Sequence, residues 1–160
     1  MKKILSLFVV VITLSSCGET EMQHAGEKGI KVTSPWLREP PPGSQSAAGY
    51  LFIQNFEKKD DRLLGVTSSA AERVEIHEIQ DEGGMLRMRE MENGLSVPAH
   101  DSVTLEPGGY HLMFIEPKRT LVLGDTVPMV LSFEQFGEYK VDFQVKSSVQ
   151  SNQEKLHMHH

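Results

Sequence analysis

The sequence predicts an all-β domain, an antiparallel sandwich or barrel of about eight or nine strands. Short runs rich in β-branched and aromatic residues recur between clusters of glycine, proline, asparagine and serine from Ile30 onward. Apolar and polar residues alternate without interruption over residues 139–146, as in a strand with one face on a core. No stretch has a convincing helical period, so we expect little or no helix.

The predicted strands follow one another along the whole domain. They cover residues 30–33, 49–55, 62–67, 71–79, 85–91, 103–105, 111–115, 128–133 and 139–146. We expect the first strand at a sheet edge, ended by Ser34-Pro35-Trp36, because proline cannot donate to a β ladder. Asn93-Gly94 predicts a tight turn.

Residues 1–16 have the form of a secretory signal. Two lysines precede an eleven-residue apolar run, residues 4–14, which is too short to span a bilayer. Leu14-Ser15-Ser16-Cys17 resembles the lipobox of bacterial lipoproteins, which implies cleavage before Cys17 and attachment of lipid, including palmitate, to its sulfur. We therefore expect a protein anchored in the bacterial envelope and facing the periplasm, with Gly18 favouring the outer membrane. The alternative is a plain signal peptide with a chance cysteine.

The composition excludes several kinds of site and partner. Cys17 is the only cysteine, so a domain that follows it can form neither a disulfide nor a thiolate metal site. Removal of residues 1–16 takes away two of the 16 basic residues and none of the 22 acidic ones, which leaves 14 − 22 = −8. An acidic chain without a basic stripe argues against a nucleic-acid partner.

Four segments are expected: a signal at 1–16, a lipidated cysteine with a polar tether at 17–29, the folded domain at 30–146, and a disordered tail at 147–160. The tail ends in three histidines and a methionine, which could bind Cu(II) or another borderline ion or could be an accident of composition. These accessory candidates are His157, Met158, His159 and His160.

Histidine and methionine recur in pairs within the predicted strands. His111 and Met113 lie two residues apart in one strand and therefore project from the same face. Upstream, His77 and Met88 are separated by ten residues. Imidazole and thioether without thiolate suit a soft ion, above all Cu(I).

Hairpin geometry links the upstream pair. If Glu82-Gly83 forms a two-residue loop, paired residues have numbers that sum to 165, and His77 lies directly opposite Met88. Glu75 and Glu78 flank His77, but carboxylates suit harder ions, so we do not include them among the ligands.

The run from Lys31 to Lys146 resembles the periplasmic copper chaperone family called PCu(A)C. The resemblance rests on Ser34-Pro35-Trp36, Pro41-Pro42-Gly43, Ala47-Ala48-Gly49-Tyr50, residues 71–77, residues 85–89 and residues 107–113. The family signature is a histidine, ten residues, a methionine, about twenty-one residues and His-x-Met. Here the second gap is twenty-two residues, from Arg89 to Tyr110.

The resemblance implies a cupredoxin-like or immunoglobulin-like β-sandwich that binds one Cu(I). It implies that the ligands are His77, Met88, His111 and Met113. It also implies delivery of copper to the Cu(A) centre of cytochrome c oxidase, in some members with a role in Cu(B) assembly, so an oxidase subunit or another copper chaperone is the expected partner.

Other functions fit the sequence less well. A blue-copper electron carrier needs a cysteine thiolate, which the domain lacks. We find no nucleophilic-serine motif, no HExxH and no phosphate-binding glycine loop, so we do not expect an enzyme. The remaining alternative is a lipid-anchored binding or adhesion module whose histidines and methionines are incidental.

Overall fold

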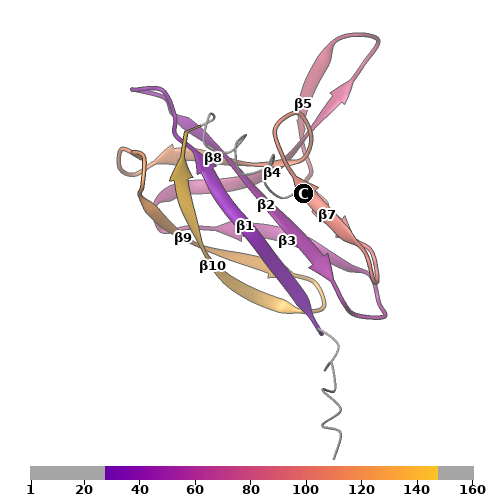
Figure 1. The fold of residues 1–160 in the computed structure, drawn as a ribbon. Helices are drawn as coiled ribbons and strands as arrows, with labels where there is room; N and C mark the ends of the chain where they lie inside the picture. The colour runs from indigo at the N-terminus through magenta and orange to yellow at the C-terminus, as the bar shows by residue number, and fades with distance from the viewer. Residues whose placement is uncertain (1–27, 148–160) are drawn as a thin grey trace, which may run out of the picture.

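The computed structural model describes residues 28–147, and in this range the chain forms ten β-strands and no helix. The all-β prediction is confirmed (Figure 1). The strands are β1 (Ile30–Arg38), β2 (Ser46–Asn55), β3 (Asp61–Thr67), β4 (Ala71–Asp81), β5 (Leu86–Glu90), β6 (Leu95–Val97), β7 (Ser102–Leu105), β8 (His111–Pro117), β9 (Thr126–Phe133) and β10 (Gly137–Lys146). Nine correspond to predicted strands, and β6, which has only three residues, was missed.

Seven of the strands close into a barrel, in the order β4-β8-β2-β1-β10-β9-β3. The ring is completed by pairing of β3 with β4, through the single register pair Val66 and Val74. Strands β5, β6 and β7 extend the ring from β4, β3 and β2. The predicted sandwich of two separate sheets is therefore not confirmed, because pattern alone could not reveal the pairing that joins the sheet ends.

Strand β1 is not an edge strand, and the sequence prediction was wrong on this point. It pairs with β2 on one side and with β10 on the other. The strand continues past Pro35 through an irregularity between Thr33 and Trp36, where Ser34 has a φ of 51°. A missing N–H is tolerated at a bulge, so proline does not end the strand there.

The pairing of β1 with β10 is parallel, whereas the prediction was of a purely antiparallel fold. Trp36 lies opposite Gln144, and Arg38 lies opposite Lys146. Since both strands run in the same direction, the described chain enters the barrel at one end and leaves it at the other (Figure 1).

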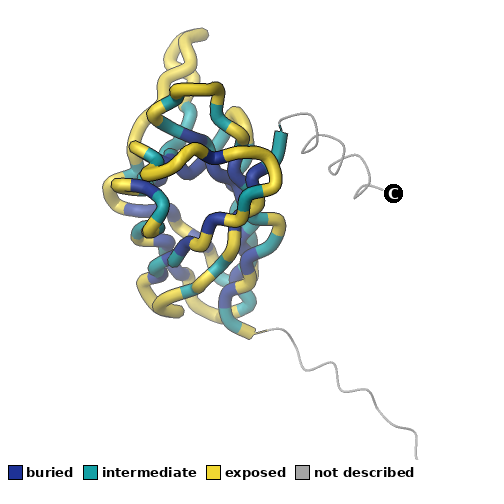
Figure 2. Tube along the Cα trace, turned by 90° about the vertical axis from the view of Figure 1, so that its left-hand side faces the viewer, coloured by how far each residue is buried: buried dark blue, intermediate teal, exposed yellow. Residues whose placement is uncertain are grey.

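The buried residues form one core cluster, and Figure 2 shows that they lie on segments all around the ring. The predicted alternation of β10 is confirmed, since Phe143 and Val145 are buried while Gln144 is exposed. The largest fully buried side chains come from strands all around the barrel and include Phe114, Phe143, Leu37, Ile53, Leu63, Leu105, Leu112 and Leu131.

A hairpin made of the end of β4 and of β5 projects from the barrel (Figure 2). We call residues 78–90 the arm. Every residue of β5 is exposed, and the arm carries the exposed apolar side chains Met85, Leu86 and Met88. Its turn consists of Gly83 and Gly84, with φ of 68° and 90°. Two successive positive φ angles are the requirement of a type I′ hairpin turn, which glycine meets without strain.

Candidate metal site

The two predicted histidine ligands lie opposite each other on neighbouring strands. In the antiparallel register of β4 and β8, His77 pairs with His111, and their ring centroids are 5.6 Å apart. The adjacent pair, Ile76 and Leu112, is buried in the core. Because side chains alternate along a strand, the two histidines project from the outer face of the barrel.

Each imidazole makes one hydrogen bond to an acceptor of the protein. Nε2 of His77 lies 2.9 Å from Oε2 of Glu75, and Nδ1 of His111 lies 3.1 Å from the carbonyl oxygen of Gly109. A carboxylate and a carbonyl only accept hydrogen bonds, so the ring nitrogens facing them must carry the protons. In the neutral rings the lone pairs then lie on Nδ1 of His77 and Nε2 of His111.

Those two lone-pair nitrogens are buried and, within residues 28–147, have no hydrogen-bond partner. A buried polar atom without a partner costs free energy, so each such atom in a folded protein needs an explanation. A histidine that donates one N–H to the protein and leaves the other nitrogen free has the form of a metal ligand. The donor set of this pair therefore fits a metal ion.

Burial also keeps His111 in its ligand form. The residue is only 3% exposed. This desolvation is the main cause that lowers the pKa of His111, and the neighbouring His77 and Arg38 lower it further, against the opposing effect of the Gly109 hydrogen bond. The ring is thus neutral at pH 7 and able to donate its lone pair.

Met113 and Met88 share the face of the histidines but flank His77 on different sides. Met113 pairs with Glu75, two residue pairs from His77 toward the start of β4. Met88 pairs with Ile79, two residue pairs from His77 toward the tip of the arm. Met88 is 50% exposed. The register therefore brings the histidines together and leaves the two thioethers apart.

The predicted pairing of His77 with Met88 is wrong, because the turn lies one residue later than expected. A loop at Glu82-Gly83 would force a glutamate to adopt positive φ, at a cost of about 1–2 kcal/mol, whereas Gly83-Gly84 avoids this cost. Paired residues sum to 167 rather than 165, so Glu90 lies opposite His77. A shift of two residues keeps Met88 on the same face.

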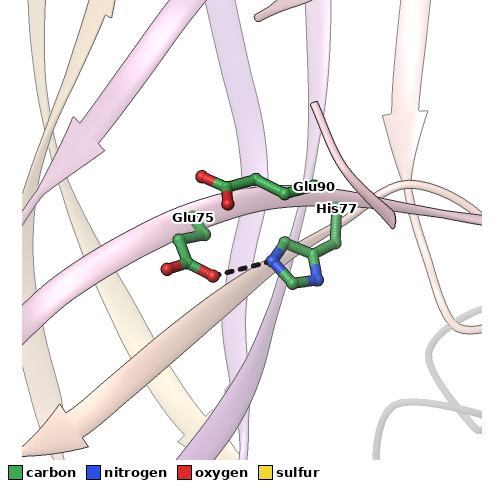
Figure 3. A group of neighbouring side chains, drawn as sticks. All are labelled: Glu75, His77 and Glu90. Atoms are coloured by element: carbon green, nitrogen blue, oxygen red, sulfur yellow. Dashed lines mark hydrogen bonds and ion pairs between the residues drawn. The ribbon is translucent and has the colours of Figure 1, made fainter. Parts of the chain in front are cut away.

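Two carboxylates that sequence reasoning did not select gather around His77. One ligand atom each from Glu75, His77 and Glu90 can be chosen so that all three lie within 4.8 Å of one another (Figure 3). Arg73 holds the other oxygen of Glu75 through an ion pair. Hydrogen bonds from Arg73, and then from His77, lower the pKa of Glu75. Strand periodicity could have found Glu75, which lies two residues before His77, but Glu90 becomes visible only through the register.

Aromatic residues continue the row of the histidines on β1 and β2. Trp36 pairs with Tyr50, and their ring centroids are 4.6 Å apart. The Arg38 guanidinium lies 5.5 Å from the centroid of the Tyr50 ring, and its Nε is buried without a partner among the described residues. Trp36, the only tryptophan of the chain, therefore lies near the histidine pair.

Cys17, the signal at 1–16 and the tail candidates His157, Met158, His159 and His160 lie outside the described residues. Within residues 28–147, no helix is long and apolar enough to cross a membrane.

Comparison with known proteins places residues 30–145 in a family described as "Putative lipoprotein LpqE-like". A curated relative, "Putative lipoprotein Lxx21020" of Leifsonia xyli, is 27% identical over 150 residues, which cover 94% of this chain and 88% of that protein. "Uncharacterized protein RP573" of Rickettsia prowazekii is 25% identical over 112 residues, or 68% of this chain and 61% of that protein.

Solved structures with the same fold include domains titled PCuAC. The copper-bound PCuAC domain from PmoF2 is 30% identical, with a TM-score of 0.63, and the match covers 74% of this chain and 92% of that domain. The apo PCuAC domain from PmoF1 is 28% identical, with a TM-score of 0.64 and coverages of 76% and 98%. The Cu(I) form of DR1885 from Deinococcus radiodurans, at 23% identity and a TM-score of 0.60 over 83% and 87%, supports the fold alone.

Proposed function

Because the chain belongs to the LpqE-like family and its folded part is a PCuAC-type domain, we propose that it is a copper chaperone. It binds one Cu(I) ion as cargo through His77, Met88, His111 and Met113. The observation that carries this proposal is the pair of buried, unpartnered imidazole nitrogens on facing strands.

The chemistry of the donors supports Cu(I). Thioethers are soft ligands and, unlike paired thiols, do not form disulfides in an oxidising compartment. The domain after Cys17 contains no thiol, so sulfur ligation falls to methionine. Methionine oxidation to the sulfoxide is the remaining hazard.

Binding by all four residues brings together two thioethers that the register places on opposite sides of His77. His77 and His111 are already together, and Met113 is two residues from His111 on the same strand. Met88 is carried by the exposed arm on the far side of His77. We propose that Met88 joins the ion last and leaves first, which opens a coordination position for a ligand of the receiving protein.

We further propose that the folded domain spans residues 30–146. Residues 1–16 are removed and Cys17 carries lipid, so that residues 17–29 tether the domain to a membrane of the bacterial envelope. The domain faces the periplasm, and the outer membrane is the favoured membrane. The tail, residues 147–160, is an accessory Cu(II)-binding segment. The receiving partner is cytochrome c oxidase at its Cu(A) centre, with Cu(B) as a second acceptor, or another copper chaperone. The sequence lipobox, the family and the donor set support these assignments.

The test is an anaerobic Cu(I) competition titration on a reference chain. This chain is full length, with Cys17→Ser and with alanine at His157, Met158, His159 and His160, so that only the domain site remains. It should hold one Cu(I), and His111→Ala combined with Met113→Ala should hold almost none. Met85→Ala is the matched control, because Met85 is an exposed methionine of the arm that we do not assign to the site.

Unchanged affinity in the double variant would reject the site. Failure of the reference chain to retain one equivalent of copper would favour the alternative, a lipid-anchored binding module with incidental histidines and methionines.

A further inference from the structure

Three hard or borderline donors meet at the base of the arm. Oε2 of Glu75 lies 2.9 Å from Nε2 of His77, and Glu90 of β5 pairs directly with His77. Ligand atoms of all three lie within 4.8 Å of one another (Figure 3). The type I′ turn at Gly83-Gly84 fixes this register and places a carboxylate in the position opposite His77.

We propose that Glu75, His77 and Glu90 form a second donor set of the same site, which holds a borderline divalent cation, with Cu(II) as the ion of highest affinity. Carboxylate oxygen and imidazole nitrogen suit Cu(II), whereas thioether suits Cu(I). The inference rests on the proposed copper site, for which it names a second cargo.

His111 borders this donor set. Its side chain lies across from His77, with ring centroids 5.6 Å apart, and the residue is 3% exposed. Its Nε2 is buried and has no partner within the described chain. This nitrogen is not among the atoms that lie within 4.8 Å of one another, so the donor set of the divalent ion consists of one nitrogen and two oxygens, from His77, Glu75 and Glu90.

The spacing is close to that of a formed site. Adjacent ligands of one divalent ion are about 3 Å apart, since their bonds to the ion are about 2.0–2.2 Å long. Oε2 of Glu75 and Nε2 of His77 already have this spacing, at 2.9 Å, and Glu90 lies within 4.8 Å of both.

Both carboxylates have an oxygen available to the ion. Arg73 holds Oε1 of Glu75, which leaves Oε2 turned toward His77. Glu90 is exposed, and within residues 28–147 its carboxylate makes no hydrogen bond or ion pair, although the charge of Arg73 interacts with it. The positive charge of Arg73 offsets part of the charge of the two glutamates, so the empty pair does not need a metal ion to fold.

The two donor sets use different nitrogens of His77. The divalent ion replaces the proton on Nε2, which now faces Glu75, and the neutral ring then carries its proton on Nδ1. Cu(I) needs the lone pair of Nδ1. The two ions therefore exclude each other, and the site holds one ion at a time.

The experiment uses the same reference chain, titrated with Cu(II) in air and with Cu(I) anaerobically. Glu90→Gln should weaken Cu(II) binding at least about tenfold and change the Cu(II) electron paramagnetic resonance spectrum, while the Cu(I) affinity stays within about threefold. Met88→Leu should weaken Cu(I) binding at least about tenfold, while the Cu(II) affinity stays within about threefold. Glu78→Gln is the matched control, because Glu78 neighbours His77 but pairs with Arg89 on the other face of the arm.

An unchanged Cu(II) affinity and spectrum in Glu90→Gln would overturn the second donor set. A loss of both ions in Glu75→Gln together with no effect of Glu90→Gln would also overturn it, because Glu75 would then act only by positioning His77. Failure of the Cu(I) proposal is separable, since it would appear as absent Cu(I) binding by the reference chain itself. Cu(II) and Cu(I) bound together at two equivalents would contradict the shared use of His77.

Discussion

Replacement of His111 by leucine should stabilise the metal-free protein and abolish Cu(I) binding. A buried polar atom without a partner costs about 1–3 kcal/mol, and Nε2 of His111 is such an atom. The change also removes the hydrogen bond from Nδ1 to Gly109, worth about 0.5–1.5 kcal/mol. The balance is a gain of about 1 kcal/mol, or roughly 4 °C in Tm for a domain of this size.

Copper should reverse the order of stability. At a free Cu(I) concentration one hundred times its Kd, binding stabilises the wild type by about 2.7 kcal/mol, and the leucine variant gains nothing. The wild type should then exceed the variant by about 1.7 kcal/mol. The assay is urea denaturation of both proteins with and without Cu(I), in the tail-substituted reference chain. Met85→Leu, an exposed substitution in the arm, should change neither curve.

The advantage of the leucine variant should also depend on pH. Burial lowers the pKa of His111 in the folded protein, so below about pH 6.5 the unfolded chain binds a proton that the folded chain does not. The free energy of unfolding of the wild type is therefore unaffected by protonation of His111 above pH 6.5 and decreases as the pH falls toward the folded-state pKa. The leucine variant has no such group, so the stability difference between the two proteins should grow from pH 7.5 to 5.5.

One result would refute the assignment of an unpaired nitrogen to His111. It is a metal-free leucine variant that is less stable than the wild type by more than about 1 kcal/mol.

Three further predictions concern the barrel and the arm. Gly94→Ala should cost about 3 kcal/mol in urea denaturation, because Gly94 has a φ of 73° and an added Cβ would lie 2.4 Å from the carbonyl oxygen of Leu63; a cost below about 1 kcal/mol would contradict this. Asp61→Ala should cost about 2–3 kcal/mol by the same measurement, since the buried carboxylate accepts three backbone N–H groups, and a neutral result would mean that water replaces it. Met88→Leu should lower Cu(I) affinity about tenfold and change the free energy of unfolding by less than about 0.5 kcal/mol, because Met88 is exposed. An unchanged Cu(I) affinity would exclude Met88 as a ligand. Met113→Leu should lower both the Cu(I) affinity and the free energy of unfolding.

Local chemistry predicted where the strands lie, and long-range pairing decided how they join. The alternation of residues 139–146 identified β10 because a half-buried strand needs that pattern. Nothing near Pro35 could reveal that β1 is covered by β10, which lies about a hundred residues later. The sequence therefore predicted an edge strand where the structure has a central one.

The candidate site was predicted to the extent that it depends on side-chain alternation. His111 and Met113 share a face because they are two residues apart, and this holds in β8. The facing of His77 and His111 needs the pairing of β4 with β8, which the residues alone did not predict; the family resemblance implied only that both histidines bind one ion. The position of Glu90 depended on which glycines form the turn, and a difference of one residue in the turn moved the register by two.

The parallel course of the first and last strands sets the direction in which the protein presents its cargo. Leu37 pairs with Gly49, which pairs with Leu112, so the histidines are level with the far end of β1, about 20 Å from Ile30. Lys146 lies at that same far end, opposite Arg38. If the residues before Ile30 are attached to a bilayer, as we propose, the histidine pair would lie at the end of β1 that is farther from that bilayer, on the side from which an acceptor protein can approach.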